Sequence, residues 1–322
     1  MMRTALRHFV VPALVTAALV AWLLVRVSPQ HLMKAAGEIA WVPLMAATGV
    51  MVVALYFWDA VCLTTVYSVH RNRWSYVESL HLRGLSYLGG CVNYELGQAA
   101  LAWGLARLQH TGVLKMLSRS VLLAYHDVFV LLTTSLIGSL LTDDPRVTRV
   151  RPFLVIGVCV ALAIAIVFKL LPRSIRERFR RSDRESFLEG WSFLRSVRLI
   201  GMRLVYFGIL TIYAVIALRI CSVPMDHRVA VSAMPLVLLA DGLPSFAGLG
   251  TRETSMQLLL DPGREHAAVL LAMSFFWSTG MLTGRMAIAL ANLWIRQLGY
   301  EPAAELQDEN DIAHSGRSQS RT

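Results

Sequence analysis

The sequence predicts an all-α polytopic membrane protein with about six full transmembrane helices and two re-entrant or broken helical segments. The first observation is composition: 56% of the residues are apolar and 16% are charged, whereas soluble domains have roughly 45–50% and about 25%. The second is a set of six stretches near the ~20 apolar residues that a helix needs to cross a bilayer. The third is a pair of segments too rich in glycine and polar residues for ordinary spans, yet too apolar for surface loops.

The six predicted spans begin close to the N-terminus and end near residue 295. They are Phe9–Val25, Trp41–Val66, Ser120–Leu141, Phe153–Leu171, Leu199–Cys221 and Ala267–Ile295. Arg3 and Arg7 precede the first span, as basic residues do in a signal peptide. However, Arg26 follows it and no small-x-small cleavage site is evident. We therefore interpret the first stretch as a membrane anchor.

The two polar segments are Leu85–Leu105 and Val229–Leu260. Irregular backbone at membrane depth is tolerated only where protein or a water-filled cavity surrounds it, so both are interpreted as re-entrant or broken helices. Each half of the chain then holds two spans, a polar segment and one further span. Because three crossings are an odd number, the halves would lie in opposite orientations, as the inverted repeats of many transporters do.

Basic residues between the spans predict the orientation. With a cytoplasmic N-terminus, the basic groups within residues 71–83 and 107–119 and the linker 173–198 are also cytoplasmic, whereas the basic loop 146–151 faces outward against the rule. The linker has the pattern of an amphipathic helix on an anionic leaflet, with a solvated basic linker as the alternative. We expect an integral membrane domain over residues 1–300 and a disordered polar tail over 301–322, in a bacterial inner membrane with both termini cytoplasmic.

This composition excludes a water-soluble enzyme, a nucleic-acid-binding module and a disulfide-stapled secreted domain. The net charge is +10, but most of the basic excess lies between apolar runs, where topology rules predict it. The four cysteines fall in or beside apolar stretches and are interpreted as packing residues. Neither metal-ligand spacing nor a phosphate-binding Gly-x-x-x-x-Gly-Lys loop occurs, so no metal or cofactor is expected.

The first polar segment contains a predicted helix start. Gly89 and Gly90 loosen the backbone there. Asn93 is suited to cap a helix that begins at the next residue, with Glu95 in its first turn and Gln98 one turn further on. The amino end of a helix attracts anions, so this site is expected to receive an anionic head group. The alternative is that Glu95 only offsets the dipole of its own helix.

The second polar segment concentrates ionisable groups beside a second predicted helix start. Pro244 ends one helix, Gly248 and Gly250 permit a tight turn, and Thr251 is expected to cap the next helix. Arg252 and Glu253 would occupy its first turn. Because charges at membrane depth are costly unless paired or hydrated, they are functional candidates. Since neighbouring residues project differently from a helix, each is expected to have a partner elsewhere. A buried ion pair that clamps the bundle is the alternative.

Other charges inside apolar segments are possible partners. They are Asp59, His126, Asp127, Asp241 and Arg285. In the last span, Gly280 and Gly284 form a Gly-x-x-x-Gly face next to Arg285, with Ser274 and Ser278 preceding it. This spacing indicates close packing of helices more than chemistry.

At these residues the chain resembles the transmembrane region of lysylphosphatidylglycerol synthases and their stand-alone relatives, the flippase-like integral membrane proteins. The family's late motif, a proline followed by Gly-Gly-Leu-Gly-x-Arg-Glu, is matched by Pro244 and residues 247–253, with alanine in place of the first glycine. Its early motif, Pro-Gly-Arg-x-Gly-Glu, is matched cleanly only at Gly97. Gln98 stands where a glutamate is expected, and Glu95 where an arginine is.

The resemblance covers about residues 5–298 and implies a protein that moves a polar-headed lipid between leaflets, or helps to do so. In fused relatives a soluble aminoacyl-transferase domain makes the lipid. Only the polar tail follows the last predicted span here, so the synthase activity is not carried over.

The leading hypothesis is a flippase or transporter for a phospholipid or a polyprenyl-linked lipid, without enzymatic activity. Arg252 and Arg285 would hold phosphate oxygens, while Glu253, Glu95 or Asp127 would hold a cationic or hydroxyl-rich part. The expected partners are the lipid and a lipid-synthesising enzyme.

Two alternatives stay open. One is a non-transporting accessory subunit of a lipid-modifying or glycosyl-transfer enzyme. The other is a membrane-embedded transferase in which Asp127 or Glu253 acts as general base, against which the lack of a paired-carboxylate or metal-binding motif argues.

Overall fold

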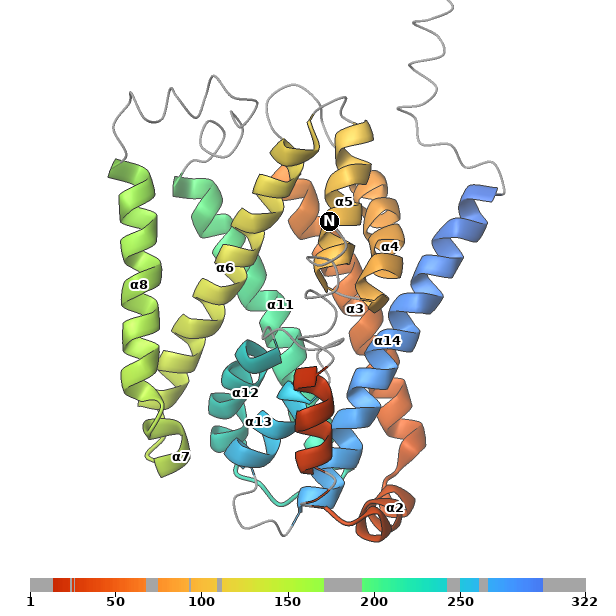
Figure 1. Cartoon of the computed structure of the whole chain (residues 1–322), viewed down its shortest axis with the longest axis vertical. Helices are drawn as coiled ribbons and strands as arrows, with labels where there is room; N and C mark the ends of the chain where they lie inside the picture. Colours follow the sequence, from red (N-terminus) through yellow and green to blue (C-terminus); the bar gives the residue numbers. More distant parts are fainter. Residues whose placement is uncertain are drawn as a thin grey trace, which may run out of the picture.

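The computed structural model describes residues 14–23, 25, 27–67, 75–92, 94–108, 112–170, 193–241, 250–260 and 266–297. Every regular element within those residues is a helix (Figure 1). A helix over Leu14–Leu23 comes first. The labelled helices that follow are α2 (Pro29–Glu38), α3 (Trp41–Tyr67), α4 (Tyr76–Val92), α5 (Tyr94–Leu108), α6 (Val113–Leu140), α7 (Pro145–Thr148), α8 (Arg151–Leu170), α11 (Phe193–Ile220), α12 (His227–Asp241), α13 (Thr251–Leu260) and α14 (Ala267–Gln297).

Four helices are long and apolar enough to cross a membrane. They are Trp41–Tyr67, Met116–Leu140, Phe193–Ile220 and Ala267–Ile295. They coincide with four of the six predicted spans. The other two predicted spans correspond, over the described residues, to the shorter apolar helices Leu14–Leu23 and Arg151–Val167. A total of six spans therefore stays a prediction.

The first polar segment forms two helices, α4 and α5, that pack against each other. The new helix begins at Tyr94, as predicted, although the helix before it starts at Tyr76 and so extends the segment toward the N-terminus. Gly97 makes the close approach possible, because a Cβ atom there would lie 2.9 Å from the Cα atom of Gly90. At 1.5 Å per residue these helices are about 25 and 22 Å long, shorter than the ~30 Å hydrocarbon core.

The second polar segment also forms a pair of packed helices, α12 and α13. Helix α12 ends at Asp241, three residues before Pro244. The prediction that Thr251 caps α13 is wrong. The carbonyl of Gly250 accepts the Thr254 N–H at 3.0 Å, so Gly250 takes the capping position and Thr251 is the first helical residue. Gly250 has φ +93°, which glycine adopts without strain.

The two helix pairs lie at opposite ends of the bundle. Figure 1 shows α4 and α5 in the upper half and α12 and α13 in the lower half, while α3, α6, α11 and α14 extend through both. Helix α4 packs on α14, and α12 packs on α6. Helix α3 also contacts α14, α11 contacts α6, and α3 and α11 pack on each other at the centre. Exchange of α3 with α11, of α4 with α12 and of α6 with α14 therefore leaves this set of contacts unchanged.

The Gly-x-x-x-Gly face of α14 packs on α3, which confirms its interpretation as a packing surface. A Cβ atom at Gly280 would lie 2.6 Å from Cγ2 of Thr48, and one at Gly284 would lie 2.8 Å from Cγ1 of Val52. The largest apolar core extends from this contact to α11, α12 and the buried Trp277.

Several basic residues that were predicted in loops lie on helices. Arg83 is in α4, Arg107 is in the last turn of α5 and Arg119 is in α6. Helix α11 begins at Phe193, so the last six residues of the predicted linker 173–198 are helical. The rest of that linker up to residue 192, and the tail 301–322, lie outside the described residues.

Replacement of Gly97 by alanine should destabilise the contact between α4 and α5. The new Cβ atom would meet the backbone of Gly90, which cannot rotate away, and overpacking of this kind costs about 1–3 kcal/mol. Gly90→Ala is the matched control, because a Cβ atom there has no atom within 4 Å. The unfolding temperatures of both variants in detergent provide the test. Equal unfolding temperatures for Gly97→Ala and Gly90→Ala would contradict the close contact between α4 and α5.

Candidate functional site

Four charged residues from four helices form a buried network, called here the Arg203 network. It comprises Asp59 on α3, Arg83 on α4, Asp127 on α6 and Arg203 on α11. Arg203 donates from Nη1 to Oδ1 of Asp59 at 2.9 Å and from Nη2 to Oδ2 of Asp127 at 3.2 Å. Its Nε atom lies 2.6 Å from the other oxygen of Asp127, and Arg83 pairs with Asp59. One guanidinium therefore holds two carboxylates.

This network lies inside the bundle. Asp59 is 1% and Arg203 is 3% exposed. Taking a charge out of water is costly, and here each charge is compensated by an opposite charge and by hydrogen bonds. The indole of Trp58 donates to the carbonyl of Met202 at 2.8 Å, which fixes α3 against α11 next to the ion pairs.

Arg285 on α14 lies at the border of the Arg203 network. Its guanidinium carbon is 5.6 Å from the ring centre of Tyr87, and that of Arg83 is 5.1 Å from the same ring. The charge of Arg285 also acts through space on Asp59. Among the described residues, no carboxylate lies within ion-pair distance of Arg285.

A second buried cluster, called here the Glu253 network, surrounds the amino end of α13. Glu253 is completely buried, and its Oε1 atom accepts hydrogen bonds from the hydroxyls of Ser274 and Ser278, each at 3.0 Å. Its Oε2 atom accepts the N–H of Gly250 at 2.6 Å. Glu253 thus returns to the residue that precedes its own helix, as the glutamate of a capping box does. The carboxylate fixes the end of α13 to α14.

Arg252 belongs to the same network but has different partners. It pairs with Asp241 at the end of α12 and donates from Nη1 to the hydroxyl of Ser278 at 3.3 Å. Its guanidinium carbon lies 4.7 Å from a ring centre of Trp277. As the sequence predicts, each of the neighbouring residues has a partner elsewhere, Asp241 for Arg252 and Ser274 for Glu253, while Ser278 contacts both.

The Glu253 network is connected to the centre of the bundle through aromatic and hydroxyl groups. Tyr213 on α11 packs edge-on against Trp277, with ring centres 5.0 Å apart. Its hydroxyl lies 2.8 Å from the hydroxyl of Thr48 on α3. Helix α14 provides Ser278 to the Glu253 network and Arg285 at the border of the Arg203 network. These two residues are seven apart in the sequence and therefore share one helix face, about 10 Å apart.

The structure brings half of the predicted site residues into these networks. Asp127 belongs to the Arg203 network, with Arg285 at its border. Asp241, Gly250, Arg252 and Glu253 belong to the Glu253 network.

The remaining predicted residues are placed only in part by the described residues. Asn93, Gly248 and the side chain of Glu95 lie outside the described residues. Gln98 is partly buried, and its Oε1 atom is buried without a hydrogen-bond partner. His126 bonds to the carbonyl of Leu122 in its own helix at 2.8 Å.

Sequence reasoning missed Arg203 and misplaced Arg83. Arg203 lies well inside the predicted span Leu199–Cys221, where an arginine is itself a signal of function or pairing. Arg83 was counted as a marker of the cytoplasmic side, although it points into the bundle and pairs with Asp59.

Other sites of chemistry are scarce in the described part of the chain. No group of three metal-ligating side chains occurs there. Cys62 and Cys221 are buried, and burial raises the pKa of the Cys221 thiol to about 11, as expected for a packing residue. Cys91 is partly buried and Cys159 is exposed.

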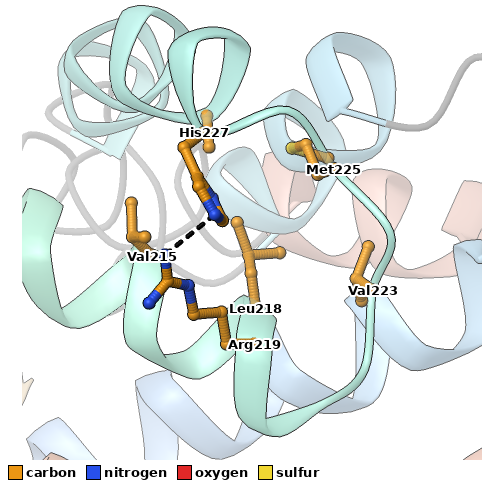
Figure 2. A pocket seen from close by; sticks show the side chains of 7 residues that line it. Val215, Leu218, Arg219, Val223, Met225 and His227 are labelled. Atoms are coloured by element: carbon orange, nitrogen blue, oxygen red, sulfur yellow. Dashed lines mark hydrogen bonds between the residues drawn. The ribbon is translucent and has the colours of Figure 1, made fainter.

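Figure 2 shows a small pocket at the turn between α11 and α12, where Arg219 lies 2.8 Å from Nε2 of His227. None of its lining residues belongs to either network.

Comparisons of this chain with models of known protein families, with curated proteins and with solved structures found no match.

Removal of Arg203 should destabilise the protein strongly. In Arg203→Gln the buried Asp59 and the partly buried Asp127 lose their shared partner, and breaking a buried pair in this way costs about 3–5 kcal/mol. Arg219→Gln is the control, because Arg219 is exposed at the end of α11 and such changes stay within about 0.5 kcal/mol. Chemical unfolding in detergent measures both. Equal stability of the two variants would show that Arg203 is not held as described.

Proposed function

We propose that this protein moves a polar-headed lipid, either a phospholipid or a polyprenyl-linked lipid, between the two leaflets of a membrane. The observation that carries the proposal is the position of two buried charge networks beside two pairs of short helices in an otherwise apolar bundle. Ionisable groups at membrane depth are costly and mark substrate or ion pathways by default. The head group would pass along these networks while the acyl chains stay in lipid.

An inverted repeat is part of this proposal. The contacts of the four long helices and the two helix pairs are retained when the halves of the chain are exchanged. The helix pairs lie in opposite halves of the bundle in Figure 1. In transporters built from inverted repeats, interrupted helices meet near the middle of the membrane and form the binding site. This architecture gives each leaflet an equivalent half of the pathway.

Lipid movement requires a change from the arrangement described here. Glu253 is fully buried and Arg203 nearly so, which means that these two side chains are closed to a head group, whereas Asp127 and Asp241 are partly exposed. Glu253 bonds α13 to Ser274 and Ser278 of α14. The Arg252–Asp241 ion pair joins the start of α13 to the end of α12. Exchange of these bonds for bonds to a head group would let the pair move away from α14.

Loss of the Glu253 network should abolish lipid movement. We expect Glu253→Ala with Arg252→Ala to reduce the transbilayer movement of labelled phospholipid and polyprenyl-linked lipid in reconstituted vesicles to the rate of protein-free vesicles. Arg219→Gln, outside both networks, should retain the wild-type rate.

Wild-type rates in the double variant would remove the proposed site. Inactive wild-type protein that purifies with a lipid-modifying enzyme would favour the accessory-subunit function instead.

The proposal also fixes the topology in an inner membrane. Six spans, with each helix pair returning to its own side, leave both termini in the cytoplasm and residue 143 outside. Helices α2 and α7 lie at the same end of the bundle in Figure 1, as this topology requires. Phosphatase fused at Asp143 should be active and phosphatase fused after Tyr300 inactive. The reverse pattern would contradict the orientation.

A further inference from the structure

The described charges at the Arg203 network do not balance. Among the described side chains, three guanidinium groups, those of Arg83, Arg203 and Arg285, are close to two carboxylates, those of Asp59 and Asp127. Arg203 occupies both oxygens of Asp127, and Asp59 is shared between Arg203 and Arg83. Arg285 is therefore the cation whose charge no described carboxylate offsets at ion-pair distance.

Arg285 lies deep in the longest apolar helix. It is ten residues before Ile295, the last residue of the apolar part of α14, which corresponds to about 15 Å along the helix. In a hydrocarbon core of ~30 Å this depth is close to the middle. The residue shares a face of α14 with Ser274 and Ser278, which point into the bundle, yet its side chain is only partly buried. A guanidinium at this depth is costly unless it is paired or hydrated, and an anionic group would offset its charge.

Features of the neighbouring α4–α5 pair favour an anion over a cation at this position. The guanidinium of Arg83 lies over the same Tyr87 ring as that of Arg285, so two positive charges converge there. Cys91 on α4 contacts the carbonyl of Leu282 on α14, one turn before Arg285. Helix α5 begins three residues after Cys91, and the amino end of a helix adds partial positive charge.

Arg252, unlike Arg285, has a described carboxylate partner. Its guanidinium is occupied by Asp241, Ser278 and the ring of Trp277. The sequence pattern assigns both arginines to phosphate oxygens, but in this structure only Arg285 is free of a described carboxylate partner.

We propose that Arg285, beside Tyr87 and the amino end of α5, is a binding site for a phosphate oxyanion, and that this phosphate belongs to a lipid head group. A guanidinium matches phosphate geometry with two parallel hydrogen bonds. The inference deepens the proposed function, because it names the part of the lipid that the protein recognises, but binding at Arg285 is measurable without any movement of lipid.

The test compares two photoactivatable lipids with identical acyl chains, phosphatidic acid and diacylglycerol, bound to the purified full-length protein in detergent. We expect the wild-type protein to cross-link phosphatidic acid at least about tenfold more efficiently, as a charge-assisted hydrogen bond implies. Arg285→Gln should lose this preference and Arg285→Lys should retain part of it. Arg219→Gln, which removes an exposed arginine of the same chain, should behave as the wild type.

Three results would overturn the inference. The first is an unchanged preference for phosphatidic acid in Arg285→Gln. The second is displacement of the lipid by inorganic phosphate as effectively as by short-chain phosphatidic acid, which would identify free phosphate as the ligand. The third is a loss of stability in Arg285→Gln as large as in Arg203→Gln without ligand, which would make Arg285 a structural partner of Asp59. A protein that binds phosphatidic acid through Arg285 but moves no lipid would remove only the proposed function.

Discussion

The burial of Arg203 between two carboxylates is the interaction on which the arrangement of the central helices depends. Asp59 and Asp127 come from the first half of the chain and Arg203 from the second. An apolar environment strengthens such ion pairs and makes their separation costly. Apolar packing between membrane helices is little more favourable than packing against lipid, so polar contacts of this kind fix which helices are neighbours. The ion pairs therefore hold the two halves in one register.

The two networks differ in the chemistry that they offer. Among the described side chains, guanidinium groups outnumber carboxylates around Arg203, whereas the carboxylates of Asp241 and Glu253 outnumber the guanidinium of Arg252. Both networks contact the same face of α14, about 10 Å apart at Ser278 and Arg285. A head group with an anionic and a cationic or hydroxyl-rich part would find matching partners along that face. The Gly280 and Gly284 contacts with α3 keep α14 close enough to the centre for this arrangement.

The sequence predicts the parts of this structure that depend on local pattern. The four long helices follow from apolar length, the start of α5 from Gly89, Gly90 and Asn93, and the start of α13, within one residue, from Gly248 and Gly250. That Arg252 and Glu253 each have a partner elsewhere follows from helix geometry. The identity of the hydrogen-bond partners does not follow from the sequence, because Ser274 and Ser278 reach Glu253 only through the register of α13 against α14.

The partners of Arg203 were equally inaccessible to a single sequence. An arginine inside a span is a signal of pairing, but the pairing with Asp59 joins residues 144 positions apart. Arg83 has the spacing of a topology marker but the environment of a buried ion pair. The tertiary structure is therefore needed to tell which charged residues near the ends of apolar segments are orientation signals and which are site residues.

The depth of α4 and α5 in the bilayer tests whether this helix pair enters the membrane and returns to its own side. Spin labels at Leu96, exposed near the start of α5, and at Tyr76, exposed at the start of α4, would be compared in a variant without the four native cysteines. Oxygen and water-soluble relaxation agents then report the depth of each label in lipid vesicles. For a re-entrant pair we expect a label at residue 96 near the bilayer centre and one at residue 76 near the surface. Surface depth for both labels, or opposite surfaces for the two, would contradict it.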